Sequence, residues 1–202
     1  MTLQREKCVV CFLRVCIIAI LLPSCVFGPT PVRIYSPSKE LISGYGLTSK
    51  VPIKMELYLS DELRAAEWQR KGSSGSYRLA LGEALARNAE KVTREVFAAV
   101  VVTGGSGGPG MAGTNAVLIP RFVTAEQTAV TLTVLLEWTL KDDKGNTVWV
   151  DTIKGEGDAS AWFLESAIEQ RSKAMLDDLF HKSFLALSSS RAIREFAAKH
   201  EK

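Results

Sequence analysis

Two periodicities of apolar residues, one of two and one near 3.6, divide most of the chain after residue 50 into strands and helices. Residues 51–59 alternate apolar and polar side chains, which predicts a strand with one buried face and one face in water. Residues 60–69 open with Ser-Asp-Glu and predict a short helical turn, and residues 71–76 predict a loop. Residues 77–97 repeat apolar side chains at helical spacing opposite charged ones, so we expect one long helix there.

More strands are expected after this helix. The short apolar run 98–103 predicts a strand, although the helix could also extend into it. Residues 104–115 form a glycine-rich loop. Residues 116–123 predict another strand, in which Pro120 favours a sheet edge or a bulge.

The clearest strand pattern spans residues 129–141, where apolar side chains occupy alternate positions with a single exception. Residues 142–145, Asp-Asp-Lys-Gly, then predict a hairpin turn. A four-residue loop would place Trp138 opposite Trp149, an aromatic pair that adds roughly 0.2–1 kcal/mol. The same register puts Asp151 on the apolar side, so we expect a bulge or a strand end near it.

The C-terminal part of the chain predicts helices. Residues 160–187 form a long helix, and Ser190 is expected to cap a final short one that carries Ile193 and Phe196. The long helix has an apolar stripe made of Leu176, Leu179, Phe180, Phe184 and Leu187. The whole pattern predicts an α+β fold, a two-layer sandwich in which an antiparallel meander sheet carries two long helices on one face.

The N-terminus has the layout of a secretory signal. Three basic residues, Arg5, Lys7 and Arg14, precede an apolar run over residues 15–22. This run is far shorter than the roughly 20 residues needed to span a bilayer. We therefore expect residues 1–24 to be a cleaved signal peptide.

The last residue of the apolar run and the three residues after it, Leu22-Pro-Ser-Cys25, resemble the bacterial lipobox. The resemblance implies that Cys25 becomes the first residue of the mature protein and carries lipid, including palmitate. Two other interpretations remain open: ordinary cleavage after Gly28, and an uncleaved membrane anchor.

The segment after the lipobox predicts a spacer. Residues 25–50 are rich in proline and glycine and show little periodicity, so we expect the lipidated cysteine and a flexible tether there. Residues 51–202 are expected to form a single α+β domain that contains the glycine-rich loop 104–115. Val26 follows the lipid-bearing cysteine where a sorting aspartate would otherwise stand, which by analogy favours the outer membrane and leaves the inner membrane open.

Composition excludes several classes of function. All four cysteines lie within the first 25 of the 202 residues, which argues against a disulfide framework, a cysteine nucleophile or a thiolate metal site in the folded part. The net charge of +3 comes mostly from the leader, and the rest of the chain is nearly balanced. Nucleic-acid binding is therefore not expected, because it normally shows a clustered basic excess.

A serine-hydrolase motif is formally present in the glycine-rich loop. Gly104-Gly-Ser106-Gly-Gly108 matches G-x-S-x-G, but a nucleophile elbow needs a helix directly after the serine, and a strand pattern follows here. Only His181 and His200 could act as its base, and a flexible loop is the favoured interpretation. The loop also lacks the ending of a phosphate-binding loop.

The other candidate residues have structural explanations as well. His181 lies at helical spacing from Asp177 and Asp178, which suggests a metal or acid–base site or, as we prefer, a solvated helix face. Adjacent aspartates at 142–143 suit a turn. Trp138 and Trp149 could stack on a sugar if they faced outward, but their phase places them in the core.

Three stretches carry a family resemblance. They are residues 116–120, residues 133–149 with a D-x-x-G turn and a Val-Trp strand, and the Gly-Glu-Gly of 155–157 before the last long helix. Together with the lipobox they are similar to small bacterial envelope lipoproteins, namely YajG-like lipoproteins, auxiliary lipoproteins of ABC-type transporters and the lipopolysaccharide-assembly lipoprotein. The resemblance implies a non-enzymatic partner of a transport or assembly machine. The long loop 104–115 departs from that pattern.

The sequence thus predicts a membrane-anchored periplasmic lipoprotein that acts as a non-catalytic accessory or scaffold in an envelope complex. Its expected partners are the membrane, through the lipid on Cys25, and a protein, with no cofactor and no metal. A lipid- or small-ligand-binding module is the alternative, and a serine hydrolase at Ser106 is a remote one.

Overall fold

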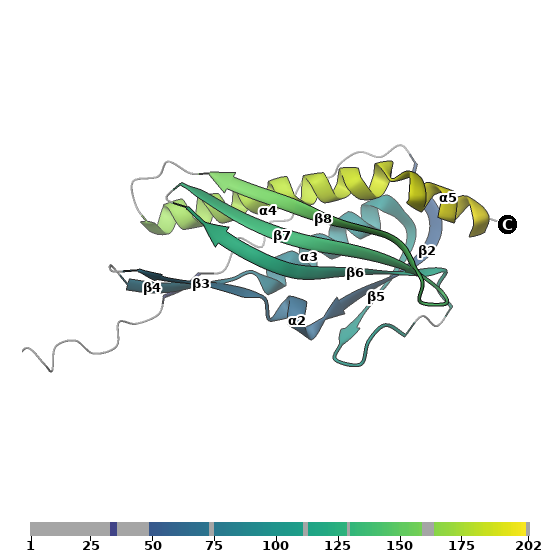
Figure 1. The fold of residues 1–202 in the computed structure, drawn as a ribbon, viewed down its shortest axis with the longest axis horizontal. Coiled ribbons are helices and arrows are strands. Elements are labelled where there is room, and N and C mark those ends of the chain that lie inside the picture. The colour runs from purple at the N-terminus through teal and green to yellow at the C-terminus, as the bar shows by residue number, and fades with distance from the viewer. Residues whose placement is uncertain are drawn as a thin grey trace, which may run out of the picture. The chain divides into compact units, whose positions relative to one another are not determined.

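The main sheet of the computed structural model has five strands in the order β5-β2-β6-β7-β8 (Figure 1). These strands are β2 (Val51–Ser60), β5 (Phe97–Gly105), β6 (Ala116–Gln127), β7 (Thr131–Asp142) and β8 (Thr147–Asp158). A second sheet has three short strands in the order β1-β4-β3, namely β1 (Arg33–Tyr35), β3 (Glu67–Gly72) and β4 (Gly75–Ala80).

The structure describes residues 33–35, 49–72, 75–110, 113–128, 130–158 and 164–200. The predicted signal peptide, Cys25 and most of the predicted tether lie outside these residues. The chain divides into two compact units, one made of residues 34–69 and 78–202 and the other of residues 1–33 and 70–77. The main sheet and the helices belong to the first unit.

The main sheet is mixed. Strands β6, β7 and β8 form the expected antiparallel meander, whereas β2 runs parallel to both β5 and β6. The prediction of an α+β fold is confirmed. The sheet is not wholly antiparallel, because the chain leaves β2, crosses to β5 on one side of it, and then crosses back to β6 on the other.

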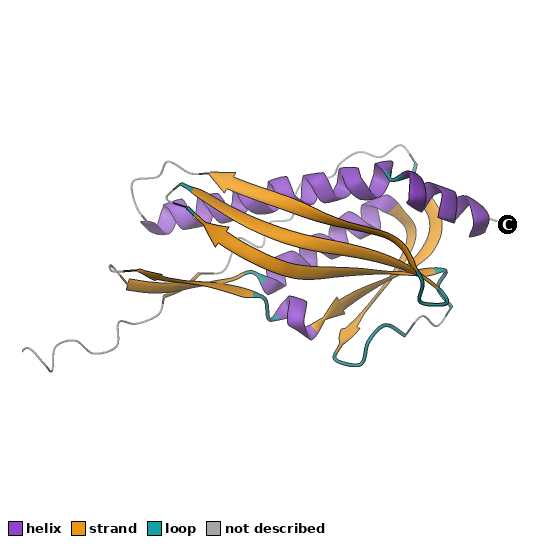
Figure 2. Ribbon diagram, viewed as in Figure 1, coloured by secondary structure: helices purple, strands orange, loops and turns teal. Residues whose placement is uncertain are grey.

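Helices cover one face of the sheet (Figure 2). They are α2 (Asp61–Arg64), α3 (Gly82–Val96), α4 (Leu164–Ser189) and α5 (Arg191–His200). The apolar stripe predicted on the long helix is confirmed, since each of its five members is buried. It packs against the buried side of β7, which consists of Leu132, Val134, Leu136, Trp138 and Leu140. Ser190 begins the last helix as predicted, and its Oγ accepts a hydrogen bond from the Ile193 amide at 3.4 Å.

The region around the first long helix differs from the prediction. The helical turn ends at Arg64, where β3 soon follows, and the expected loop is largely the two strands β3 and β4. The helix expected from residue 77 begins only at Gly82, because Tyr77 to Ala80 belong to β4. The first residue of this helix has to be glycine, since a Cβ at position 82 would collide with the backbone carbonyl of Arg64.

The hairpin of β7 and β8 has a different register from the predicted one. Trp138 lies opposite Asp151, and Trp149 lies opposite Leu140, so the predicted tryptophan pair is wrong. Asp142 bonds to Asn146 across the turn, and the register shifts next to Lys141, which leaves Val148 as an extra residue. The longer turn and this bulge move the register by two positions. The bulge expected near Asp151 therefore lies closer to the turn.

Helix α4 lies directly on the backbone of β8. A Cβ added to Gly155 would lie 2.7 Å from the Met175 carbonyl oxygen and even closer to the Leu179 side chain. A Cβ added to Gly157 would collide with the carbonyl of Arg171 and lie 2.9 Å from the Met175 Cβ. The Gly-Glu-Gly of this strand is thus explained by packing, because any side chain here would push the helix away.

We predict that Gly155→Ala lowers the free energy of unfolding by about 1–3 kcal/mol, because the added methyl group overpacks the contact between β8 and α4. Urea denaturation measures the change. Gly107→Ala is the matched control, since a Cβ there meets nothing within 4 Å. Equal stability of the two variants would contradict the close packing described above.

Candidate functional site

The glycine-rich loop is a crossover connection that passes over β2. Strands β5 and β6 flank β2 and run parallel to it, so the chain after Gly105 must return past β2 to start β6 at Ala116. It does so on the face opposite α3, which connects β2 to β5. The first crossover runs from β2 to β5 on the helix face, and the second runs in the opposite direction, from β5 to β6, on the other face. Since both the direction and the face are reversed, the two crossovers have the same handedness, in agreement with the uniform handedness of connections between parallel strands.

Side chains of β2 hold this loop in place. Glu56, only 2% exposed, accepts hydrogen bonds from the Thr103 hydroxyl at 2.6 Å and from the Gly110 amide at 3.0 Å. Tyr58 is also buried; its hydroxyl donates to the Gly105 carbonyl and accepts from the Gly108 amide at 3.0 Å. The expectation that the polar face of β2 lies in water is wrong for these two residues.

Asn115 holds the C-terminal end of the loop on β2. Its side-chain oxygen accepts from the Lys54 amide at 3.1 Å, and its own amide donates to the Lys54 carbonyl at 2.9 Å. Both ends of the loop and its described middle are therefore bonded to β2. The loop is a structural part of the sheet, which the sequence interpretation of a flexible loop did not anticipate.

The hydrolase motif has no catalytic geometry. Ser106 is exposed and is followed by the rest of the loop and then by β6, not by a helix. His181 lies on α4, on the opposite face of the sheet. His200 lies in α5, where its ring packs against Phe196 with centroids 4.2 Å apart. The sheet separates the serine from the helix that carries His181, so the structure does not bring the two together.

Of the two carboxylates near His181, Asp178 is held by structural contacts. Asp178 accepts from the Glu156 amide at 2.9 Å and forms an ion pair with Lys182 at 2.6 Å. Burial raises the pKa of Asp177, and the nearby Lys173 partly offsets this, so the fold disfavours the charged form of Asp177. Among the described residues, no group of three His, Cys, Asp or Glu side chains could hold a metal ion.

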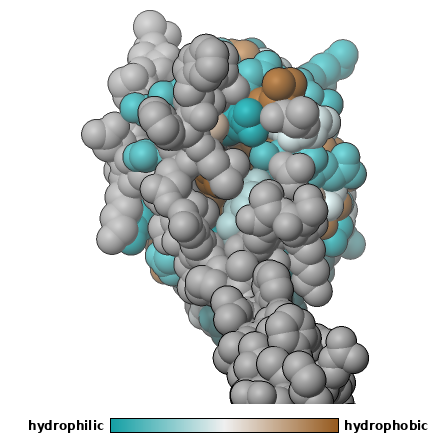
Figure 3. All heavy atoms as spheres, turned by 90° about the vertical axis from the view of Figure 1, so that its left-hand side faces the viewer, coloured by the Kyte–Doolittle hydropathy of each residue, from teal (hydrophilic) through white to brown (hydrophobic). Residues whose placement is uncertain are grey.

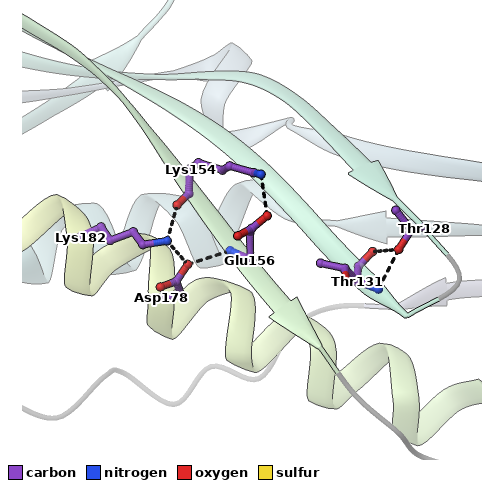
Figure 4. A network of polar contacts seen from close by, with 6 residues as sticks. All are labelled: Thr128, Thr131, Lys154, Glu156, Asp178 and Lys182. Carbon is purple, nitrogen blue, oxygen red and sulfur yellow. Dashed lines mark hydrogen bonds and ion pairs between the residues drawn. The ribbon is translucent and has the colours of Figure 1, made fainter.

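The same carboxylate and lysine cover two backbone groups on the outer edge of β8 (Figure 4). Asp178 accepts a hydrogen bond from the outward amide of Glu156, and Lys182 donates one to the outward carbonyl of Lys154 at 3.2 Å. Lys154 and Glu156 pair with each other at 2.6 Å. Helix side chains thus occupy backbone groups that another strand would otherwise use, a common way to block edge-to-edge association.

The opposite edge of the sheet is different. Strand β5 has nine residues and no charged side chain, and four of them are exposed, namely Ala98, Ala99, Val101 (by 44%) and Gly104. Among the described residues, no strand pairs with its outer side. The sequence analysis predicted this strand but not its place at an edge, although the uncharged run is visible in the sequence.

The remaining candidates are structural. Trp138 is fully buried, and its indole nitrogen donates to the Ser183 hydroxyl at 3.0 Å, so it cannot stack on a sugar. Asp142 accepts from the amides of Lys144 and Asn146 in the turn. The side-chain hydrogen bond from Asn146 lowers the pKa of Asp142, so this group supports the turn above the usual titration range of aspartate and loses that effect as the pH falls.

One end of the molecule can be viewed as a space-filling surface (Figure 3). At the end of the molecule shown in Figure 3, described apolar side chains form small separate patches among polar ones. No helix of the described residues is both long and apolar enough to cross a bilayer. Cys25, the predicted lipid-attachment residue, lies outside the described residues.

Comparison with known proteins identifies the fold. No protein-family model matches the sequence, and none of the curated proteins matches it. Among solved structures, a protein from Xanthomonas campestris described under the family model DUF330 is similar, with a TM-score of 0.56 and 11% sequence identity. The match covers 83% of this chain and 99% of that protein, so the two share a fold.

Two looser likenesses are to proteins named as lipoproteins. A minor lipoprotein from Acinetobacter baumannii has a TM-score of 0.36 at 14% identity, over 69% of this chain and 95% of that one. The lipoprotein GNA1162 from Neisseria meningitidis has a TM-score of 0.30 at 13% identity, over 68% and 90% of the two chains. Likeness at this level gives no information on the function of the present chain. The fold shared with the Xanthomonas protein is what the comparisons establish.

We predict that Glu56→Ala releases the glycine-rich loop from the sheet. The Gly110 amide then loses its acceptor, and its hydrogen exchange should accelerate about tenfold or more, which corresponds to about 1.4 kcal/mol or more. Residue-resolved exchange by NMR measures this. Glu126→Ala, at an exposed position of β6, is the control. Unchanged exchange at Gly110 would show that Glu56 does not hold the loop.

Proposed function

We propose that this protein is a periplasmic lipoprotein, anchored through Cys25, that serves as a non-catalytic accessory or scaffold in an envelope transport or assembly complex. The observation that carries the proposal is a contrast: the candidate catalytic residues form no active site, whereas one edge of the main sheet is unpaired. Ser106 lies apart from His181, and Asp178 and Trp138 have structural partners, while β5 offers an unpaired backbone edge suited to protein contact.

The anchor follows from the N-terminal sequence. A basic start, a short apolar run and Leu-Pro-Ser-Cys25 together form a signal of the lipoprotein type. Several acyl chains on one cysteine would hold the protein on its membrane, since a single chain binds only marginally. Val26 favours the outer membrane, with the domain facing the periplasm.

Docking of a protein is preferred over binding of a lipid or metabolite. A ligand site between the sheet and the long helix would need space there, yet α4 touches the backbone of β8 at Gly155 and Gly157. The core beside it is filled by Trp138, whose polar nitrogen already has a partner in Ser183. A hydrolase is disfavoured by the placement of Ser106.

We predict that cells fed labelled palmitate label the wild-type protein and not Cys25→Ala. An inhibitor of lipoprotein signal peptidase should make the precursor of the wild type accumulate, because cleavage occurs just before the lipid-bearing residue. Ser24→Ala is the matched control and should keep the label. If the wild type stays unlabelled, cleavage occurs elsewhere or not at all, and the anchor is disproved.

We further predict that cross-linking in the native cell, followed by purification of the full-length protein, recovers the same envelope protein in repeated experiments. Cys25→Ala should lose most of this recovery, because the soluble protein no longer shares a membrane with its partner. An unrelated lipoprotein carrying the same tag controls for chance capture. Repeated recovery of no other protein would contradict an accessory role.

A further inference from the structure

Charge is unevenly divided over the last strand and the helices that follow it. Residues 151–178 carry seven acidic and three basic side chains, whereas residues 179–200 carry one acidic and four basic side chains besides two histidines. Helix α4 runs back along β8, so the end of β8 and the start of α4 share one end of the sheet, and α5 lies at the other end (Figure 1). An acidic segment and a basic helix are thus separated along the sheet.

The exposed face of α5 carries the positive charge. Ile193 and Ala197 hold one side of this helix in the core. Five exposed residues share the side that faces water, namely Arg191, Arg194, Glu195, Ala198 and Lys199. Three of them are basic and one is acidic, so the face has an excess of two positive charges. Arg191, whose side chain is 91% exposed, pairs with Glu195 at 2.6 Å.

The elements beside α5 do not cancel this excess. Helix α5 packs against β2 and β8. Lys50, directly before β2, adds a positive charge, and Asp151 in the first half of β8 adds a negative one. The turn that leads into β8 is balanced as well, since it holds two lysines and two aspartates, Lys141, Asp142, Asp143 and Lys144. The basic face of α5 therefore remains the dominant charge at this end of the sheet.

An exposed apolar side chain lies just before the basic helix. Leu185, near the end of α4, is 49% exposed. No charged residue stands between Lys182 and Arg191. Exposed apolar side chains next to lysines and arginines are typical of protein surfaces that rest on a membrane interface. The junction of α4 and α5 combines these two features.

We propose that the basic face of α5 contacts the anionic phospholipid headgroups of the membrane in which the protein is anchored. Arginine and lysine bind phosphate through charge-assisted hydrogen bonds, and an anionic bilayer surface attracts basic segments that come within a Debye length. The same surface repels the acidic end of the domain. The two ends together therefore orient the domain, with α5 toward the bilayer.

The lipid anchor selects the membrane over an acidic protein as the occupant of this face. Two net charges bind an anionic surface only weakly from solution. A domain tethered through Cys25 meets its own membrane at a high effective concentration, so a weak contact suffices. The inference rests on the proposed function in this one respect, that the anchor keeps the domain at the membrane.

A dye at each end of the sheet tests this orientation. Ala198 is exposed within the basic face, and Val130 is 59% exposed in the turn between β6 and β7, at the opposite end. Full-length Ala198→Cys and Val130→Cys are labelled with the same maleimide dye and reconstituted into vesicles of phosphatidylcholine, with or without one third of phosphatidylglycerol. The labelled wild type sets the background from the native cysteines.

We expect phosphatidylglycerol to protect the dye at position 198 from an aqueous quencher about threefold or more, because the anionic surface draws α5 toward the bilayer. The dye at position 130 should show no such change. Raising the salt concentration should remove the protection at position 198, since salt screens exposed charges.

Charge variants of Ala198→Cys separate the basic face from other cations. Arg191→Gln combined with Lys199→Gln should lose most of the protection. Arg87→Gln combined with Lys173→Gln removes two exposed cations elsewhere and should keep it. Circular dichroism checks that both double variants stay folded.

Three results would overturn the inference: equal protection with and without phosphatidylglycerol, equal protection at the two dye positions, or protection that survives loss of the two α5 cations. Protection in native membranes but not in lipid vesicles would assign the face to a protein and overturn it too. If palmitate does not label Cys25, sedimentation of the protein with the two kinds of vesicle replaces the dye measurement, and equal binding to both overturns the inference. The anchor and the basic face are thus judged separately.

Discussion

The contact of α4 with the backbone of β8 is the constraint on which most of this structure depends. Gly155 and Gly157 let the helix approach until its own backbone touches the strand. At that distance Leu179 and Phe180 reach the buried side of the sheet, and Ser183 meets the indole nitrogen of Trp138. The hydrophobic core of the two layers is thus fixed by the absence of side chains at two positions of one strand.

The same approach covers part of one edge of the sheet. Asp178 and Lys182 lie one helical turn apart, and the helix is near enough for both to bond to backbone groups of β8. At the other edge of the sheet, Arg94 in the last turn of α3 donates to the Val100 carbonyl of β5 at 3.3 Å. The difference between the two edges is therefore a consequence of where the helices lie.

Local patterns in the sequence predicted what is local in the structure. The alternation within residues 129–141, the stripe of the last long helix and the cap at Ser190 all need only neighbouring residues, and all are confirmed in the described part of the chain. The mixed sheet could not be predicted in this way, because strand order depends on contacts between residues far apart in the chain, such as Lys54 with Asn115. Residues 77–80 were misassigned since apolar residues there fit both periods.

The predictions about candidate sites were also correct where they depended on neighbouring residues and wrong where they depended on distant ones. That Ser106 lacks a helix after it is a local property, and the sequence indicated it correctly. The roles of Glu56 and Tyr58 were missed. Polar residues at alternate positions of a strand indicate a solvent-exposed face, and only the distant loop that covers this face makes the two side chains buried. The open edge of β5 was missed for a related reason: an uncharged apolar run predicts a strand, but not whether that strand has one neighbour or two.

The central claim is that side chains of α4 cover outward backbone groups of β8, while outward amides of β5 stay open for contact with a protein. Hydrogen exchange of two amides tests it most directly when followed by NMR in the purified protein: Glu156 on β8, which donates to Asp178, and Val102 on β5, two residues from the carbonyl that Arg94 contacts on the outer edge. The account predicts slow exchange at Glu156 and exchange at Val102 that is about tenfold faster or more. Equal exchange at the two amides, or faster exchange at Glu156, would contradict it.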